Sequence, residues 1–182
     1  LGISLSIGDF CTGLRFTDRS DRTIDETYSL PAGKKAVYVN KASETRLCFE
    51  KEGIPFHLLV RAYDNGAAFR YEIPDDSRGG SLLVYRETTD FCFPARFDPL
   101  LLQDLVATYE APYHQTRWGV WPHRRHYGMP SLLHAPKDGP WVLVNAANLL
   151  TINPTASTSL GQGPAVRGLP LRSSPCHDAS PA

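Results

Sequence analysis

The densest group of side chains that could do chemistry lies between Arg117 and Gly128, in the segment RWGVWPHRRHYG. It combines two tryptophans, two histidines, three arginines and a tyrosine. Aromatic rings with a polar tip can stack on sugar rings, and arginine pairs with anionic groups. We therefore take Trp118, Trp121 and Arg124 as candidate carbohydrate-binding residues. A solvated loop that covers one end of a β-sandwich would have the same composition.

The two histidines of this segment could also share a metal ion. His123 and His126 would lie on one face of a helix. However, Pro122 and Gly128 predict a loop, and no cysteine or carboxylate lies nearby to complete a coordination shell. The segment therefore does not predict a zinc site.

Acidic side chains that could transfer protons occur in two adjacent pairs and singly. Neighbouring residues of a strand point to opposite faces, so the pair Asp25–Glu26 cannot act together. The pair Asp75–Asp76 follows Pro74 in a predicted turn, where aspartate is favoured. Glu110 lies between aromatic residues in TYEAPY. It is the strongest candidate for a single functional acid.

The elements that must position these residues are predicted to be strands. Short apolar or alternating runs, separated by Gly, Pro, Asn and Asp, recur along the chain: ISLSI, KAVYVN, TRLCFE, SLLVYRE, DFCFP, PSLLHA and PWVLVNA, the last two joined by PKDG. The segment from Pro99 to Glu110 has near-helical spacing, and it could equally be a loop with one helical turn. The expected fold class is all-β, an antiparallel β-sandwich.

One hairpin is predicted in detail, in RAYDNGAAFRYEIP (61–74). Alternating apolar runs flank Asn65–Gly66, and such a pair favours a type I′ turn because both central residues need positive φ. Charged residues of the polar face are then expected to pair across the strands: Arg61, Arg70 and Glu72.

Composition excludes some classes of partner. Lys plus Arg equals Asp plus Glu at 19 each, so the net charge is zero and no electrostatic footprint for nucleic acid is present. No apolar run approaches the roughly 20 residues of a membrane-spanning helix. Four widely spaced cysteines predict small buried side chains rather than a disulfide framework: Cys11, Cys48, Cys92 and Cys176.

The chain is predicted to contain a folded domain at 1–150 and a tail at 151–182. After Leu150 the sequence has no Phe, Tyr or Trp and is rich in Pro, Ser, Gly and Ala. Such a segment buries too little apolar surface to offset its ordering entropy, so most of the tail is expected to be disordered. Because the chain begins at Leu1, we expect a mature protein or a piece of a longer one. The change in composition predicts a truncated or out-of-frame tail.

Five motifs in order resemble the N-terminal domain of glycoside hydrolase family 97: DETYSLPAGKKAVYVNKASE, VRAYDNGAAFRYEIP, ETTDFCFP, TYEAPY and MPSLLHAPKDGPWVLVNAANL. The resemblance covers 1–150. It implies a galactose-mutarotase-like β-super-sandwich that packs against a catalytic (β/α)8 barrel further along the chain. It also implies a calcium-dependent exo-α-glycosidase, such as an α-glucosidase or α-galactosidase, in the periplasm or secreted.

This chain departs from the family pattern in two ways. The family's catalytic carboxylates lie in the barrel, which is absent, so we expect no catalytic residue here and no activity from the chain alone. In the family, a glutamate of the sandwich, in a segment like ITEANL, coordinates the calcium ion. Here the aligned segment is LVNAANL (143–149). Ala146 stands at the glutamate position and has no side-chain oxygen. Asn145 and Asn148 could supply only carbonyl oxygens, so no metal site is expected in this chain.

The resulting prediction is a non-catalytic sandwich that supports binding and hydrolysis of an α-linked glycoside by a barrel. A free-standing carbohydrate-binding or interaction module is the alternative. A plain β-sandwich that self-associates through its exposed surface is a third. Nucleic acid and membrane are not expected partners.

Overall fold

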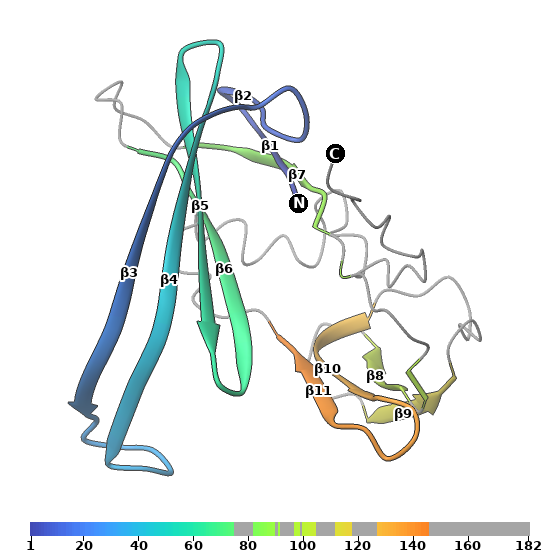
Figure 1. Cartoon of the computed structure of the whole chain (residues 1–182). Helices are drawn as coiled ribbons and strands as arrows, with labels where there is room; N and C mark the ends of the chain where they lie inside the picture. The colour runs from blue at the N-terminus through green and yellow to red at the C-terminus, as the bar shows by residue number, and fades with distance from the viewer. Residues whose placement is uncertain are drawn as a thin grey trace. The chain divides into compact units, whose positions relative to one another are not determined.

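The computed structural model describes residues 1–74, 82–89, 91, 97–98, 100–104, 112–117 and 127–145 (Figure 1). Every regular element in these ranges is a β-strand, and the strands form three antiparallel sheets. The described part therefore contains no helix that could cross a membrane. Contacts divide the chain into two compact units, Phe10–Gly80 and Leu1–Asp9 with Ser81–Ala182. Each unit is described separately.

The unit Phe10–Gly80 holds a four-stranded sheet in the order β3-β4-β5-β6. Its strands are β3 (Arg15–Ser29), β4 (Val37–Lys51), β5 (Ile54–Tyr63) and β6 (Gly66–Glu72). The turn between β4 and β5 places Glu52 and Gly53 at φ 52 and φ 78. Positive φ at both central residues is the mark of a type I′ turn, whose twist matches that of the strands it joins. Phe10 stacks on Phe56 of β5 at a ring separation of 5.0 Å.

The predicted β5–β6 hairpin is present, but its turn differs from the prediction. Tyr63 pairs with Gly66, so the two central residues are Asp64 and Asn65 rather than Asn65 and Gly66. None of these three turn residues has positive φ, and the type I′ prediction was therefore wrong. The physical reason is that Gly66 is part of strand β6, where it is extended and paired.

The second unit contains two sheets. A three-stranded sheet, in the order β2-β1-β7, is formed by β1 (Ile3–Leu5), β2 (Gly8–Asp9) and β7 (Val84–Glu87). A four-stranded sheet, in the order β11-β10-β8-β9, is formed by β8 (Leu100–Asp104), β9 (Tyr113–Thr116), β10 (Tyr127–His134) and β11 (Trp141–Val144). The open question over 99–110 is thus decided for 100–104, which form a strand paired on both sides. Residues 105–110 lie outside the described ranges.

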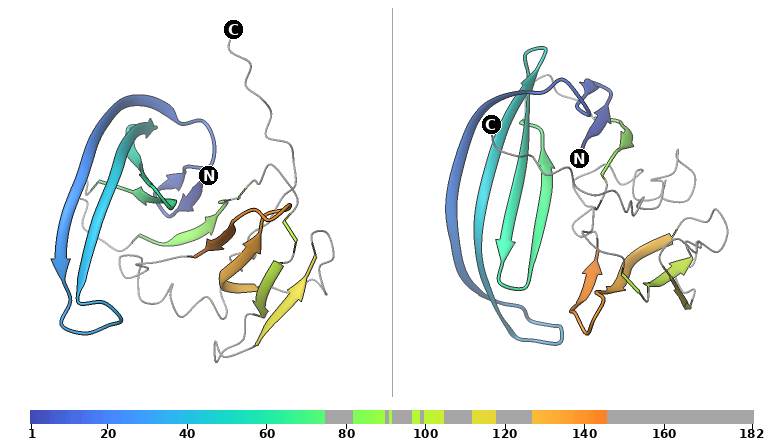
Figure 2. Two further views of the ribbon diagram at one scale, coloured as in Figure 1. Left: turned by 60° about the horizontal axis from the view of Figure 1, so that its bottom comes forward. Right: turned by 45° about the vertical axis from the view of Figure 1, so that its right-hand side comes forward.

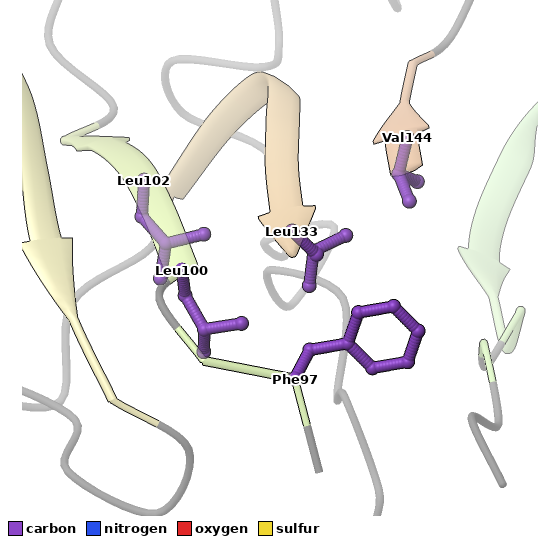
Figure 3. Close-up of a cluster of buried hydrophobic side chains, with 5 residues drawn as sticks. All are labelled: Phe97, Leu100, Leu102, Leu133 and Val144. Atoms are coloured by element: carbon purple, nitrogen blue, oxygen red, sulfur yellow. The ribbon is translucent and has the colours of Figure 1, made fainter. Parts of the chain in front are cut away.

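One face of the β8–β11 sheet carries a compact apolar core. Leu100 and Leu133 are fully buried and directly paired, and Leu102 is 2% exposed. Phe97 and Val144 complete the cluster, which Figure 3 shows together. Alternation explains the arrangement, because residues two apart on a strand share a face. This core fixes β10 and β11 relative to β8.

The cysteines give a partial test of the sequence prediction. Cys11 and Cys48 form no disulfide bond within the described residues, and both are half-buried rather than fully buried. Cys92, Cys176 and the predicted tail 151–182 lie outside the described residues.

Candidate functional site

The strongest electrostatic cluster of the described residues is a row of charges across β3, β4 and β5. Arg22 pairs with Glu44, and Glu44 pairs with Arg61, so the three side chains lie on one face of the sheet. Arg22 Nε donates to Glu44 Oε1 at 2.5 Å, and Arg61 Nε donates to Glu44 Oε2 at 2.6 Å. The Glu44 side chain is only 4% exposed. Each oxygen of a buried carboxylate is therefore held by its own guanidinium.

This arrangement shifts the protonation of the buried acid. The hydrogen bond from Arg22 is the largest cause that lowers the pKa of Glu44, and Arg61 adds to it against the opposing effect of burial. Reciprocally, Glu44 and then Tyr63 raise the pKa of Arg61. Glu44 is consequently ionised at neutral pH, with both oxygens already engaged. A carboxylate in this state is a poor proton donor and a hindered nucleophile.

A second charged group lies on the same face. Arg46 Nη2 donates to Glu72 Oε2 at 2.5 Å and lies 2.9 Å from His57 Nδ1. Because a guanidinium group only donates hydrogen bonds, His57 Nδ1 is the acceptor in this contact. Arg46 Nε is buried without a hydrogen-bond partner among the described residues. This group links β4, β5 and β6 just as the first links β3, β4 and β5.

The two acids of these groups lie well apart along the sheet, and each is held by its own arginine partners. Glu44 and Ala68 of β6 both pair with Arg61 of β5, so Ala68 is the β6 residue in register with Glu44. Glu72 lies four residues further along β6. Standard strand dimensions then place the two backbones about 16 Å apart. Paired glycosidase carboxylates lie about 5–9.5 Å apart. Within the described ranges, no three His, Cys, Asp or Glu side chains gather to hold a metal either. In the described residues, this charged face consists of carboxylates that are already held by arginine side chains.

An exposed aromatic side chain marks the second unit. Trp141 of the edge strand β11 is 51% exposed. It pairs with His134 across the hairpin, with ring centroids 4.6 Å apart and ring planes at 44°. Leu143, on the same face, is 61% exposed. This face lies opposite the core face and presents a ring that a flat apolar ligand could cover.

The loop that joins β10 to β11 is the predicted PKDG turn. Lys137 and Asp138 have φ 57 and 58, and Gly139 N donates to Pro136 O at 3.3 Å. The turn is therefore of type I′, the type that the sequence predicted in the other hairpin. A Cβ on Gly139 would lie 2.7 Å from Ala135 Cβ. The turn thus requires glycine just after its central pair.

The structure describes one of the site residues predicted from sequence. Asn145 directly follows β11 and is exposed. The other predicted residues lie outside the described ranges: Glu110, Trp118, Trp121, Arg124, Ala146 and Asn148. The predicted pairing of Arg61 with charged residues of β6 was wrong, because Ala68 stands opposite Arg61 and its ion-pair partner is Glu44 of β4. The Arg22–Glu44–Arg61 row appears only when the register of three strands is known. Trp141 stood within a predicted strand but was not singled out.

Comparison with known proteins identifies the family. The profile described as glycosyl-hydrolase 97 N-terminal matches residues 1–164. The chain belongs to this family. The match covers the whole predicted domain and enters the predicted tail.

Relatives of the glycosyl-hydrolase 97 domain are much longer than this chain. A probable retaining alpha-galactosidase from Streptomyces bingchenggensis (strain BCW-1) is 37% identical over 95 residues, which are 52% of this chain and 14% of that protein. A beta-arabinopyranosidase crystal structure has a TM-score of 0.68 and 28% identity, over 79% of this chain and 24% of that one. A glycoside hydrolase family 97 enzyme from Pseudoalteromonas sp. strain K8, in complex with acarbose, has a TM-score of 0.57 and 19% identity, over 73% and 21%. This chain spans a quarter or less of each.

These likenesses, together with the strand content, confirm the predicted fold class. The domain is an all-β antiparallel β-sandwich of the kind that family 97 enzymes carry. The glycosidase ancestry inferred from five sequence motifs is confirmed as well.

Proposed function

We propose that this chain is the non-catalytic N-terminal domain of an exo-α-glycosidase, supporting carbohydrate binding and hydrolysis by a catalytic part further along the enzyme. One observation carries the proposal: the N-terminal family profile covers 1–164. The relatives' lengths support it, since most of each relative lies beyond the matched region. The arginine-bound state of Glu44 and its distance from Glu72 agree with a role that is not catalytic.

The substrate proposed for the longer enzyme is a terminal sugar of galactose-like ring configuration. Two similar relatives are named as an alpha-galactosidase and a beta-arabinopyranosidase. An α-D-galactopyranoside and a β-L-arabinopyranoside share the configuration at C1 to C4, and the arabinoside lacks the exocyclic CH₂OH group at C5. Acarbose, bound by the neighbour at 19% identity, is gluco-configured instead. The galactose-like class is therefore the first to test.

A calcium requirement and a periplasmic or secreted location are proposed for the longer enzyme and not for this chain alone. Calcium takes six to eight oxygen ligands, preferably with carboxylates among them. Asn145 offers one exposed amide, and no acidic cluster gathers in the described part. The described residues do not fit a calcium site, and we derive no step through one. A location in the periplasm or outside the cell stays a prediction, which fractionation of the source cells would test.

The decisive experiment joins this chain to a catalytic partner. A chimera would carry residues 1–145 in place of the matching N-terminal region of the Streptomyces enzyme. We expect the chimera to hydrolyse p-nitrophenyl α-D-galactopyranoside, while the isolated chain and the Streptomyces enzyme lacking its N-terminal region do not. Hydrolysis by the isolated chain, or full activity of the enzyme without an N-terminal region, would contradict the proposal.

A free-standing carbohydrate-binding module is a second candidate, favoured by Trp141. Its half-exposed ring beside His134 is suited to stacking on a pyranose face. Calorimetry of the isolated chain against galactose and raffinose at millimolar concentration would test this role. Heat of binding that Trp141→Ala removes and Tyr85→Ala leaves unchanged would support it. The absence of heat would eliminate it.

A further inference from the structure

The hairpin β3–β4 extends beyond the rest of its sheet. Ser43 is the β4 residue nearest the connecting loop that pairs with β5, opposite Ala62. Asp25–Ser29 pair with Val37–Lys41 alone, so this part is a two-stranded ribbon. Figures 1 and 2 show β3 and β4 running on together past β5 and β6. Neither edge of the ribbon is paired with another strand of the described residues.

The outer part of this ribbon exposes large apolar or aromatic side chains on both faces. We call Thr27–Leu30 with Val37–Asn40 the ribbon end. Val37 and Val39 are 54% and 62% exposed on one face. On the other face Tyr28, 47% exposed, stacks on Tyr38 at 5.5 Å. An isolated two-stranded hairpin is marginal in water, so exposed apolar groups on both faces indicate that another surface covers it.

Charge distinguishes the ribbon end from the rest of the free edge. From Arg15 to Glu26, β3 carries seven charged side chains of both signs: Arg15, Asp18, Arg19, Asp21, Arg22, Asp25 and Glu26. Charges on an edge strand oppose pairing with another chain, including a second copy of this one. The ribbon end carries no charge at all. The charges that oppose pairing thus occupy most of the edge and end where the apolar side chains begin.

We propose that the ribbon end inserts into the part of the same glycosidase that lies C-terminal to this domain, which supplies an apolar groove for Val39 and the tyrosine pair. This inference rests on the proposed function. The length of the relatives indicates which surface covers the ribbon end. This chain spans only 14% and 24% of two relatives and matches an N-terminal profile, so most of such an enzyme lies C-terminal to it. The loop between the two strands carries Lys34 and Lys35, so charge complementarity predicts that acidic side chains border the groove.

Amide hydrogen exchange of the ribbon end tests this inference. Exchange would be compared between the isolated chain and the chimera with the Streptomyces enzyme. Docking is expected to slow exchange of these amides roughly 100-fold in the chimera, because unsupported strand ends open with little cost. Val39→Glu should abolish the slowing. Phe16→Glu is the matched control, since Phe16 is 55% exposed at the opposite end of β3, and it should leave the slowing intact.

The outcomes separate the two proposals. An active chimera whose ribbon end exchanges as fast as in the isolated chain overturns the docking and leaves the proposed function standing. The docking is also overturned if both Val39→Glu and Phe16→Glu abolish the slowing of exchange in the chimera. It is overturned as well if the isolated chain forms a dimer that Val39→Glu dissociates. If the chimera does not fold, exchange of the hairpin that corresponds to β3–β4 in the intact Streptomyces enzyme decides: protection supports the docking and its absence overturns it.

Discussion

The two four-stranded sheets of this chain are held together in different ways. In the β8–β11 sheet, one face forms an apolar cluster around Leu100 and Leu133, both fully buried. In the β3–β6 sheet, the best-buried polar side chain is Glu44, and arginines from two neighbouring strands hold it. One sheet is therefore stabilised mainly by burial of apolar surface. The other depends in part on ionic rows that run across its strands.

This difference bears on how each sheet specifies its register. A slip of one residue turns every apolar side chain of a strand to the wrong face, which an apolar core resists. A slip of two residues restores the face, and an apolar core discriminates against it less. A row such as Arg22–Glu44–Arg61 is broken by either slip, because each charge then meets an uncharged or a like-charged neighbour. Ionic rows suit the long strands β3 and β4, which offer many alternative pairings.

The largest expected effect is the loss of a core side chain. Leu133→Ala should lower the free energy of unfolding of the β8–β11 sheet by about 2–5 kcal/mol, since it leaves a cavity among Leu100, Phe97 and Val144. Hydrogen exchange of β8 and β10 amides would measure it. Leu143→Ala is the control, because Leu143 is 61% exposed on the other face and its loss should cost little. Equal effects of the two changes would mean that the cluster is not the sheet's core.

The counterpart in the charged sheet is Glu44→Ala. It leaves Arg22 and Arg61 facing each other without the carboxylate that neutralises them. Removing one partner of a buried pair costs several kcal/mol, but Arg22 is 65% exposed and partly solvated, so we expect about 1–3 kcal/mol. Urea unfolding followed by exchange in β3–β5 would measure the loss. Glu26→Ala removes an exposed acid bonded to Asn40 and should change stability by less than about 0.5 kcal/mol.

The ionic row also predicts a pH dependence with a definite sign. The pKa of Glu44 lies below its ordinary value of 4.5 in the folded state, chiefly through Arg22. Its stabilising contribution is therefore complete above pH 4.5 and is lost as the pH falls through the lowered value. Wild type and Glu44→Gln should differ most at neutral pH and converge as the pH falls through the lowered pKa of Glu44. A difference that grew on acidification would show that Glu44 is protonated in the folded chain.

The core hairpin offers a smaller steric test. Gly139→Ala would place a Cβ 2.7 Å from Ala135 Cβ and 3.0 Å from Pro136 O. The hairpin must open slightly, which we expect to cost about 1–2 kcal/mol. Thermal unfolding would measure it, with Gly66→Ala as control because a Cβ there meets nothing within 4 Å. A harmless Gly139→Ala would mean that this turn adapts more freely than its contacts suggest.

These residues also show what sequence can and cannot predict. Many strands, the PKDG hairpin and the family could be read from local alternation and motifs, because those signals lie within a few consecutive residues. Strands β3, β8 and β9 were not predicted, and β4 was predicted as two separate runs. The position of the type I′ turns could not, since Asn65–Gly66 had the favoured residues and yet Gly66 joined a strand. The row through Glu44 depends on the pairing of positions 22, 44 and 61, and no local window contains all three. The sequence around Trp141 did not indicate that its side chain is exposed, because exposure depends on how the strands assemble into the sheet.

The smallest expected effect compares the turns of the two sheets. Glu52–Gly53 and Lys137–Asp138 have the same type I′ backbone, but only the first has glycine at its second central position. Asp138→Gly should relieve backbone strain in the left-handed region and so raise the free energy of unfolding by about 1 kcal/mol or more. Glycine's larger conformational entropy in the unfolded chain lowers it by about 0.4–1 kcal/mol. We expect a net stabilisation of about 0.5 kcal/mol in urea unfolding. The reciprocal Gly53→Asp should destabilise by a similar amount, because no neighbour lies within 4 Å of its Cβ and only the backbone term changes. If Asp138→Gly instead destabilised the chain, the aspartate would have to stabilise its turn through its side chain, and the two hairpins would differ in chemistry as the two sheets do.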